Sequence, residues 1–302
     1  MTFTVEAEGQ GQRLDQLLAA AASQYSRTRL QSWIKAGLVQ VDGVVQTTPR
    51  AAIEAGQTVR LCAPEAAEPD TTVHPEAIAL DIVHEDADIL VLHKPAGLTV
   101  HPGAGQSSGT LQNALLHHRP ELAQVPRAGI VHRLDKLTSG LLVVAANLTA
   151  HTALVRALAE REITREYLAL VWGEIIAGGT IDAPLGRDPR DRRRYVVGQG
   201  GRHAITHFRV EERFARHTLL RVQLETGRTH QIRVHMHHRK WPLVGDPVYG
   251  RRGDPLRAIM PRQALHATAL GFAHPGDGSP MRFERPVPAD MQAVLEELRA
   301  QS

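Results

Sequence analysis

One stretch of the chain carries residue types that suit acid–base or nucleophilic chemistry. The segment 129–140 reads Gly-Ile-Val-His-Arg-Leu-Asp-Lys-Leu-Thr-Ser-Gly and places one carboxylate, Asp135, between Arg133 and Lys136. Apolar residues enclose this charged group, and a carboxylate beside a buried sheet is unfavourable unless it is paired or hydrogen-bonded. Asp135 is therefore either a member of a structural ion pair or a reactive group held ionised for chemistry. The glycines at both ends of the segment allow sharp backbone turns.

The histidines raise the question of a metal site. The chain has 17 of them, and His230, His235, His237 and His238 fall close together. No His-Glu-x-x-His pattern or cysteine pair accompanies this group, and the neighbouring arginines would repel a divalent cation. Histidines that are hydrogen-bonded or face a polar ligand are the simpler interpretation. We expect no metal and no cofactor.

Composition and charge limit the classes of protein to which the chain can belong. Its 302 residues are 42% hydrophobic, enough for one large domain or two unequal ones. Lys and Arg exceed Asp and Glu by only 3, yet the basic residues cluster, which suits a shaped site for a polyanion. The single Cys62 fits a reducing compartment. We find neither a signal peptide nor a membrane span, and we expect a cytoplasmic protein with no membrane partner.

Residues 1–62 are predicted to form a small basic module. Apolar residues at helical spacing predict one helix from Arg13 and another after Ser26, the expected N-cap. Gly37 can end the second helix, and the Asp42-Gly43 pair between short apolar runs predicts a β-hairpin.

Two short helices followed by a hairpin resemble the S4 RNA-binding domain, and the matching residues run from 13 to 43. The resemblance implies that Arg27, Arg29 and Lys35, which the helical pattern leaves for the surface, contact RNA. An ordinary solvated face is the alternative, because surface arginines are common.

The rest of the chain predicts a linker and a larger domain. Residues 63–77 begin with a stretch rich in proline and acids that cannot pack a core, so we expect a linker there and a second domain over 78–302. Apolar alternation and short apolar runs predict strands at 82–94, 166–172, 217–225, 265–272 and 281–283. Helical spacing predicts helices at 148–161, with Thr149 as the cap, and at 289–299. The segment 228–237 fits both periods.

This distribution of elements indicates an α+β fold. Many strands with few, scattered helices predict a catalytic domain built on a mixed, mainly antiparallel sheet with flanking helices, preceded by the S4-like module.

The segment 187–194 holds five arginines in eight residues. Arginine pairs bidentately with phosphate and stacks on bases, so Arg192, Arg193 and Arg194 are candidate contacts to an RNA backbone. A flexible charged loop is the alternative.

Five stretches of this chain resemble, in the same order, the pseudouridine synthases of the RluA type. They are 132–141 around Asp135, 94–103, 165–167, 225–235 and 242–250. The resemblance covers both domains and implies a metal-free and cofactor-free conversion of uridine to pseudouridine in RNA. The chain departs from the family pattern at Leu137 and over 251–261, which leaves the target nucleoside less defined than the reaction.

The resemblance also implies a role for each matching residue. Asp135 matches the catalytic aspartate, which acts on the target nucleoside so that the uracil detaches from N1 and rejoins through C5. Arg228 matches the arginine expected to pair with Asp135, and Tyr167 the tyrosine expected to lie against the uracil. Arg133 matches the residue that fills the gap left by the flipped uridine, and His132 beside it is a further substrate contact.

Three functions compete at this point. The first is an RNA pseudouridine synthase that acts on structured RNA, with 23S-type large-subunit rRNA favoured over tRNA, as a cytoplasmic monomer. The second is a non-catalytic RNA-binding or ribosome-assembly factor, in which Tyr167 would be core and Arg228 would pin a loop. The third is a metal-dependent phosphoesterase built on the histidine cluster, which chelator-insensitive activity would exclude.

Replacing Arg27 and Arg29 with Ala is expected to weaken RNA affinity and to flatten its dependence on salt, because fewer counterions are released on binding. Binding titrations at several salt concentrations test this. A slope equal to that of the wild type would show that this helix does not face the RNA.

Overall fold

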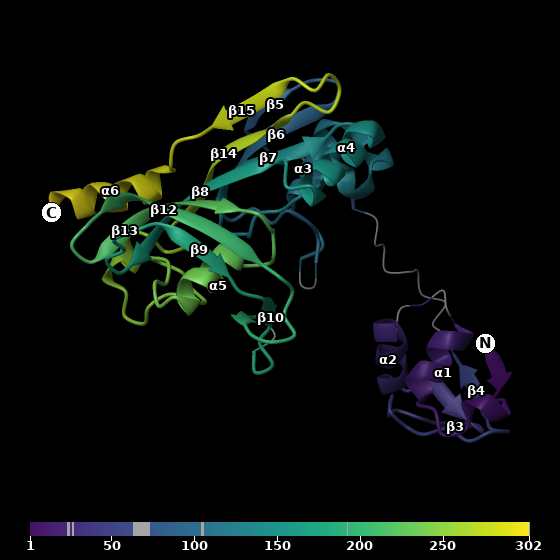
Figure 1. Cartoon of the computed structure of the whole chain (residues 1–302). Helices are drawn as coiled ribbons and strands as arrows, with labels where there is room; N and C mark the ends of the chain where they lie inside the picture. Colours follow the sequence, from purple (N-terminus) through teal and green to yellow (C-terminus); the bar gives the residue numbers. More distant parts are fainter. Residues whose placement is uncertain (23–24, 26, 63–72, 104–105, 192, 302) are drawn as a thin grey trace. The chain divides into compact units, whose positions relative to one another are not determined.

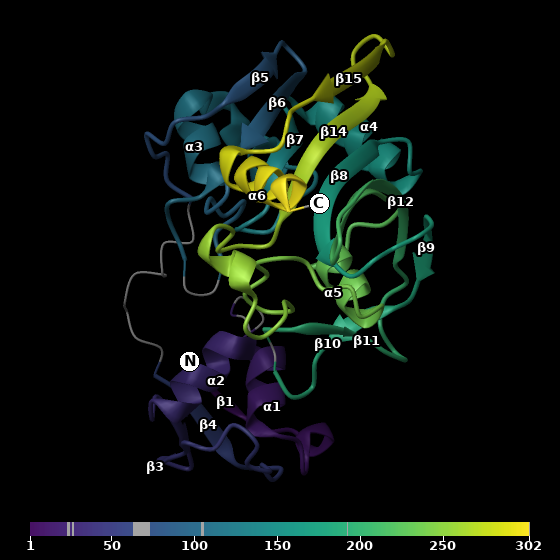
Figure 2. The ribbon, with the colours of Figure 1, turned by 90° about the vertical axis from the view of Figure 1, so that its left-hand side faces the viewer.

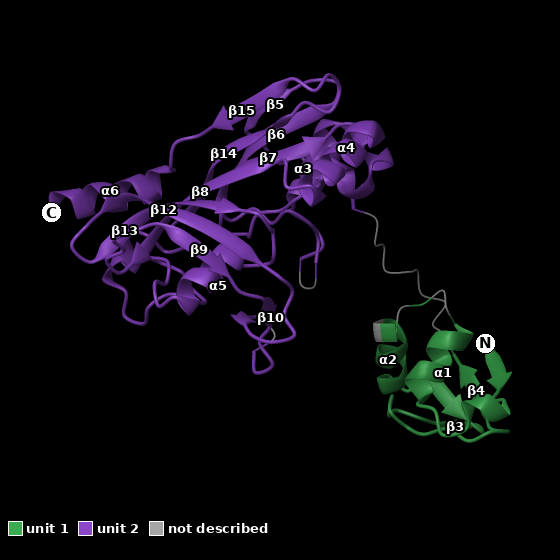
Figure 3. Ribbon diagram, in the orientation of Figure 1, with its two compact units in different colours: residues 1–72 green, residues 73–302 purple. Residues whose placement is uncertain are grey.

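The chain divides into two units, Met1–Thr72 and Val73–Ser302 (Figure 3). The computed structural model describes residues 1–22, 25, 27–62, 73–103, 106–191 and 193–301. Ser26, the expected N-cap, and residues 63–72 of the expected linker therefore lie outside the described residues.

Residues 73–77, which we expected to belong to the linker, are part of the second unit. Val73 packs against its main hydrophobic core. The carboxylate of Glu76 accepts a hydrogen bond from the backbone N–H of Gly109 at 3.0 Å. The segment has only one large apolar residue, Val73, and one acid, Glu76, too few to show a period, but both side chains find partners far away in the sequence.

The first unit packs two helices against a small antiparallel sheet with the strand order β1-β4-β2-β3. Asp42 and Gly43 have φ values of 50° and 82°, the left-handed conformations that a two-residue hairpin requires, so the predicted turn is confirmed. Its elements are β1 (Thr2–Thr4), η1 (Ala7–Gly9), α1 (Leu14–Ala21), α2 (Arg27–Lys35), β2 (Val39–Val41), β3 (Val44–Val45) and β4 (Thr58–Leu61).

A fully buried carboxylate joins the two helices of this unit. Asp15 accepts hydrogen bonds from the guanidinium groups of Arg13 and Arg27 and from the amide of Gln31. Although burial raises the pKa of Asp15, these bonds lower it overall to about 2. The charged carboxylate therefore stabilises the packing of α1 on α2.

The second unit is organised on a nine-stranded sheet with the order β5-β6-β7-β14-β8-β13-β12-β9, and β15 pairs with β14 (Figure 1). Among the strand pairs of this sheet in the described residues, β7–β14 alone is parallel, so the sheet is mixed and mainly antiparallel, as predicted. Its elements are β5 (Ile82–Glu85), β6 (Ile89–Lys94), α3 (Leu111–His118), η2 (Pro120–Gln124), η3 (Pro126–Gly129), β7 (Ser139–Ala145), α4 (Leu148–Ala159), β8 (Thr164–Trp172), β9 (Gly179–Asp182), β10 (Leu185–Arg187), β11 (Tyr195–Val197), β12 (Ile205–Arg213), β13 (His217–Leu224), α5 (Gln231–His238), η4 (Pro255–Ala258), β14 (Leu265–Ala273), β15 (Pro280–Glu284) and α6 (Ala289–Ala300).

Strand alternation divides the side chains of this sheet between separate cores. In β8, Tyr167, Ala169 and Val171 belong to the core that includes residues of α3 and α5. Leu170 and Trp172 point the other way and pack with α6, which lies across the sheet in Figure 2. Since successive side chains of a strand point to opposite faces, a strand that is apolar throughout must be covered on both sides. The predicted central position of β8 is confirmed, because it lies between β14 and β13.

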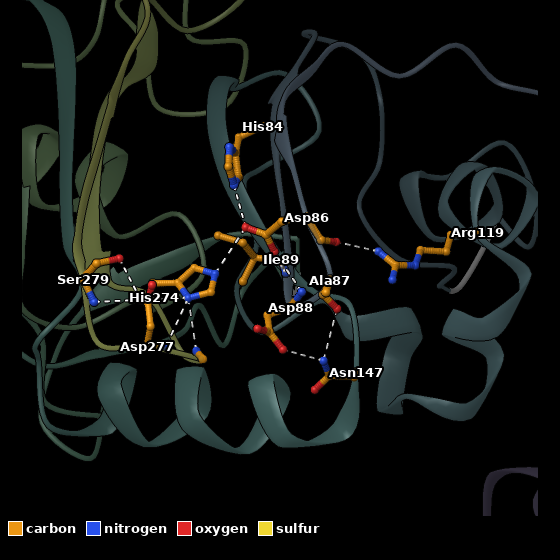
Figure 4. Close-up of polar contacts among 11 residues, drawn as sticks. His84, Asp86, Ala87, Asp88, Ile89, Arg119, Asn147, His274, Asp277 and Ser279 are labelled. Carbon is orange, nitrogen blue, oxygen red and sulfur yellow. Dashed lines mark hydrogen bonds and ion pairs between the residues drawn. The ribbon is translucent and has the colours of Figure 1, made fainter.

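A polar network fixes the turns at the end of β5, β6 and β14 (Figure 4). The carboxylate of Asp86 contacts the rings of His84 and His274 at 2.6 and 3.2 Å and accepts hydrogen bonds from the turn backbone. Partial burial would raise the pKa of Asp86, but these bonds lower it to about 2. Asp88 in the same turn accepts a hydrogen bond from Asn147, which ties the turn to the start of α4.

Two details of the helices differ from the prediction. The N-cap of α4 is Asn147, whose side chain accepts from the N–H of Ala150 at 2.8 Å, and not Thr149. The ambiguous segment 228–237 becomes a turn followed by helix α5. Across the described residues, each helix is too short or too polar to span a membrane.

Two glycines bring the chain around Asp135 close to the sheet. A Cβ on Gly129 would lie 1.9 Å from the carbonyl oxygen of Ala145, and one on Gly140 would lie 2.3 Å from that of Ala267. Both residues also have positive φ, so any side chain would add strain to a steric clash. The segment between them is therefore pressed against β7 and β14.

Replacing Asp15 with Asn is expected to destabilise the first unit at neutral pH, because two arginines lose their buried partner. The pKa of Asp15 is lowered from 3.8 to about 2 by folding, so its stabilising effect is complete above pH 3.8 and is lost as pH falls through 2. Urea midpoints followed through NMR signals of α1 amides should therefore converge for the two proteins in acid. A difference that stays constant down to pH 2 would contradict this account.

Candidate active site

The loop that carries Asp135 is held by its backbone. The buried ammonium group of Lys94 donates to the carbonyl oxygens of Pro95, Leu98 and Lys136. The guanidinium group of Arg262 donates to the carbonyl oxygen of Leu137 at 3.0 Å. A loop whose backbone carbonyl groups are hydrogen-bonded has low mobility. These bonds from Lys94 and Arg262 therefore fix the position of the Asp135 backbone.

The buried lysine responds to this environment. Burial lowers the pKa of Lys94 to about 7, and the negative charge of Asp135 opposes that shift. Three carbonyl acceptors suit an ammonium group, which has three N–H donors. Lys94 therefore anchors the loop and contributes positive charge near Asp135.

The side chain of Asp135 is paired with Arg233. The guanidinium Nη1 donates to Asp135 Oδ2 at 3.0 Å. Two further nitrogens of the same group bind both oxygens of Asp246, at 2.7 and 3.0 Å. Although burial lowers the pKa of Arg233, Asp246 and Asp135 raise it overall, so the guanidinium stays charged. One arginine thus bridges two carboxylates in a fixed geometry.

Arg233 is directed by the start of helix α5. The side chain of Gln231 accepts from the N–H of Arg228 and the hydroxyl of Thr226, and it donates to the carbonyl oxygen of Ile205. These bonds replace an ordinary cap and fix the first turn of the helix against β12. Arg233 follows in that turn and is 5% exposed in its side chain.

The predicted pairing of Arg228 with Asp135 is wrong. Arg228 lies in the turn before α5 and donates from Nε to the carbonyl oxygen of His203 at 3.1 Å. Arg233, one turn further along, takes the place that the sequence analysis gave to Arg228. Arg228 still lines the same cavity, where it adds positive charge.

Asp135 opens into a cavity of about 880 Å³ in the second unit. Of the two carboxylates bound by Arg233, Asp246 has no exposed side-chain surface, whereas 18% of the Asp135 side chain is exposed. Tyr167 and Arg133 also line this cavity. The site therefore offers one accessible carboxylate, paired with a charged guanidinium and fixed in its direction.

The other residues that line the cavity differ in whether a hydrogen bond or an ion pair holds their side chains. Burial raises the pKa of Tyr167, so the hydroxyl keeps its proton, and it forms no hydrogen bond with any described residue. Arg133 is exposed and likewise has no ion pair within the described part of the chain. His132 is fixed, because its Nε2 accepts from the N–H of Val143 at 3.1 Å, and burial lowers its pKa to about 3.

The candidate RNA contacts lie in varied surroundings. Arg27 is paired with Asp15, and the guanidinium of Arg29 lies 5.5 Å from the ring centre of Trp33. Lys35 is exposed at the end of α2. In the 187–194 segment, Arg193 pairs with Asp191 of its own loop, Arg194 stacks on Tyr249 at 5.2 Å, and Arg192 lies outside the described residues.

Three of the clustered histidines, His230, His235 and His237, have protein partners. His235 is fully buried, with its ring nitrogens bound to Thr206 and to the carbonyl oxygen of Ala183. His237 is bound to the carbonyl oxygen of Tyr249. Within the described ranges, no three His, Cys, Asp or Glu side chains are arranged to hold a metal ion.

Several residues that shape the site were not assigned a role from the sequence. Arg233, Asp246, Tyr249 and Lys94 all lie inside the motifs, and Arg262 lies outside them. A helical period would have grouped Arg233 with His230 and His237, three and four residues away. No periodic signal marks Asp246 or Tyr249, which lie in a loop.

The comparisons with known proteins agree with this geometry. The sequence pattern described as RNA pseudouridylate synthase matches residues 88–238, which include Asp135, Tyr167 and Arg233. The pattern of the S4 domain matches residues 12–59, so the predicted S4-like module is confirmed. The chain belongs to the RNA pseudouridylate synthase family, and it is an isomerase of uridine in RNA.

Individual relatives define the similarity more closely. The "Ribosomal large subunit pseudouridine synthase D" of Xanthomonas campestris pv. campestris is 50% identical over 302 residues, which cover 97% of this chain and 90% of the relative. The protein of the same name from Escherichia coli (strain K12) is 49% identical over 310 residues, with 99% and 94% covered. Among solved structures, human RNA Pseudouridylate Synthase Domain Containing 1 is 28% identical, with 74% of this chain and 96% of that chain covered at a TM-score of 0.57.

Replacing Arg233 with Lys is expected to lower kcat about 100-fold, because a single ammonium group cannot bridge two carboxylates and Asp135 loses its direction. The matched Arg228→Lys variant keeps the charge of a residue that does not bind Asp135, and its kcat should stay near that of the wild type. Steady-state kinetics on substrate RNA compare the two. Equal losses in both variants, or a larger loss for Arg228→Lys, would contradict the assignment.

Proposed function

We propose that this protein converts uridines of large-subunit ribosomal RNA to pseudouridine, with Asp135 as the catalytic group. The observation that carries this proposal is the asymmetric bridge formed by Arg233: it binds two carboxylates, of which only Asp135 reaches the cavity. The near full-length similarity to proteins named for the large ribosomal subunit supports the choice of RNA.

The proposed reaction rearranges one bond of the nucleoside. The C1′–N1 bond breaks with its electron pair left on the uracil, the base turns, and a C1′–C5 bond forms. C5 loses its proton and N1 gains one, so the product is an isomer and no oxidant or co-reactant is consumed. Asp135 can start the cleavage by attack at C1′ or by removal of a sugar proton that leads to a glycal. Both courses require an ionised carboxylate aimed at the sugar.

Tyr167 is suited to a position against the target uracil. It lies on the central strand β8, between Val222 and Ala267 of the neighbouring strands, so its ring is held rigidly. Its protonated hydroxyl has no other partner among the described residues, which leaves it available to move the sugar or C5 proton.

RNA binding is proposed to use both units. A uridine reaches Asp135 only after it leaves its stack, which costs a few kcal/mol. Arg133, exposed at the cavity and without a described partner, is the residue proposed to fill the gap. Arg27, Arg29 and Lys35 of α2 are proposed to contact the RNA backbone. Arg27 also forms an ion pair with Asp15. A large-subunit rRNA substrate places the protein in the cytoplasm, and we expect it to act as a monomer.

Replacing Asp135 with Asn is expected to abolish pseudouridine formation while RNA binding is kept, because the amide cannot attack or take a proton but has the same shape. The matched control is Asp277→Asn, which changes an exposed carboxylate in the β14–β15 turn and should leave activity unchanged. Unmodified large-subunit rRNA and tRNA are incubated in parallel without added metal or nucleotide, and pseudouridine is mapped in each.

The outcomes separate the competing functions. Loss of activity in Asp135→Asn alone supports the proposal. Wild-type protein that binds the rRNA and forms no pseudouridine would support a non-catalytic RNA-binding factor instead. Modification of tRNA but not rRNA would overturn the proposed substrate and keep the reaction.

A further inference from the structure

His230 occupies a left-handed backbone conformation that is uncommon for residues other than glycine. It precedes α5 with φ 57° and ψ 19°, in the left-handed region. Among residues other than glycine, asparagine, aspartate and histidine adopt such conformations most often, and these conformations cluster at functional sites. The side chain makes no capping hydrogen bond to the helix it begins, and the residue lines the cavity that contains Asp135.

The ring of His230 is held by Tyr249. The Tyr249 hydroxyl lies 2.9 Å from His230 Nδ1, and it accepts a hydrogen bond from the backbone N–H of Tyr195 at 2.8 Å. Tyr249 is only 2% exposed, and within the described residues its hydroxyl makes no hydrogen bond to another acceptor. A buried O–H left without an acceptor is unfavourable, so this proton is donated to Nδ1.

This direction of donation fixes the tautomer of His230. Burial lowers the pKa of the imidazole, with the charge of Asp135 acting in the opposite sense, and a neutral ring carries one proton. Since Nδ1 accepts from Tyr249, the proton is on Nε2. Nε2 has no hydrogen-bond partner among the described residues and is not sealed from the cavity. His230 lines the same cavity as Asp135, so this fixed N–H donor is available to a ligand there.

We propose that the Nε2–H of His230 donates a hydrogen bond to a carbonyl oxygen of the target uracil and stabilises the ring after it leaves C1′. The inference rests on the proposed reaction. When the C1′–N1 bond breaks, its electron pair stays on the uracil, and the two carbonyl oxygens take up part of the negative charge. A preorganised donor binds that charged ring more strongly than the neutral nucleoside, which lowers the barrier.

One short motif directs both this donor and the catalytic carboxylate. Asp246 Oδ1 accepts from the backbone N–H of Tyr249 at 2.9 Å and from Arg233. The Arg233 guanidinium lies 5.0 Å from the ring centre of Tyr249. The 242–250 segment thus fixes the direction of the Asp135 side chain through Arg233. It fixes the ring of His230 through Tyr249. The donor and the carboxylate are therefore held in one mutual geometry.

Two substitutions at His230 separate its chemistry from its backbone strain. Asn tolerates the left-handed conformation and can accept from Tyr249, but it is too short to place an N–H at the position of Nε2. His230→Asn should therefore unfold at a temperature no lower than that of the wild type, with kcat about 100-fold lower and KM nearly unchanged. His230→Gln reaches the position of Nε2 with an N–H and should have a higher kcat than the Asn variant.

Steady-state kinetics on rRNA fragments and thermal unfolding of both variants test this. A wild-type kcat in His230→Asn would overturn the inference. So would a loss confined to KM, which would indicate a contact to the RNA backbone, or a Gln variant no more active than the Asn variant.

The tautomer is measured in the free protein, independently of the proposed reaction. With ¹⁵N-labelled histidine, the ring signals of His230 are assigned by their loss in His230→Asn. The wild type should carry the proton on Nε2 at neutral pH, and Tyr249→Phe should change the tautomer population. A wild-type proton on Nδ1 would overturn the inference even if the protein forms pseudouridine, whereas an inactive wild type would overturn the proposed function.

Discussion

The site depends on one buried guanidinium shared by two carboxylates. Arg233 binds Asp246 through two nitrogens and Asp135 through a third. A charge buried this deeply is tolerated only when it is paired and hydrogen-bonded, and the fully buried Asp246 meets that requirement by itself. Asp135 can therefore remain partly exposed and available to a substrate while Arg233 directs its side chain. In a single Arg–Asp pair, one carboxylate would have to neutralise the buried guanidinium and also react with the substrate. With two carboxylates, Asp246 does the first and Asp135 is available for the second.

The fold supplies the two sides of this bridge from distant parts of the chain. One side is the loop after η3, which lies close to β7 and β14 because Gly129 and Gly140 lack side chains. The other is the first turn of α5, fixed to β12 by the side chain of Gln231. Both are fixed to strands of the same sheet in the second unit, which holds one in place relative to the other. Tyr167 lines the same cavity from strand β8, which has core residues on both faces.

The sequence predicted the elements that have a clear local signal. The Asp42-Gly43 hairpin and strand β8 follow from turn chemistry and from an apolar run of strand length. Helix α5 was ambiguous because Ile232, Val234 and Met236 alternate like a strand, while the first and last also share a helical face. The expected pairing of Arg228 with Asp135 came from the family resemblance, whereas in the structure Arg233, in the first turn of α5, binds Asp135. The loop residues that direct it have no period, and their roles arise from tertiary contacts alone.

A crystal structure of the Asp135→Asn protein with an rRNA fragment tests the central claim most directly. We expect the target uridine to be flipped out with its C1′ against the side chain at position 135, while Arg233 still contacts the side chains at positions 135 and 246. A uridine that remains stacked in the RNA, or an Arg233 that has turned away to bind a phosphate, would contradict the account.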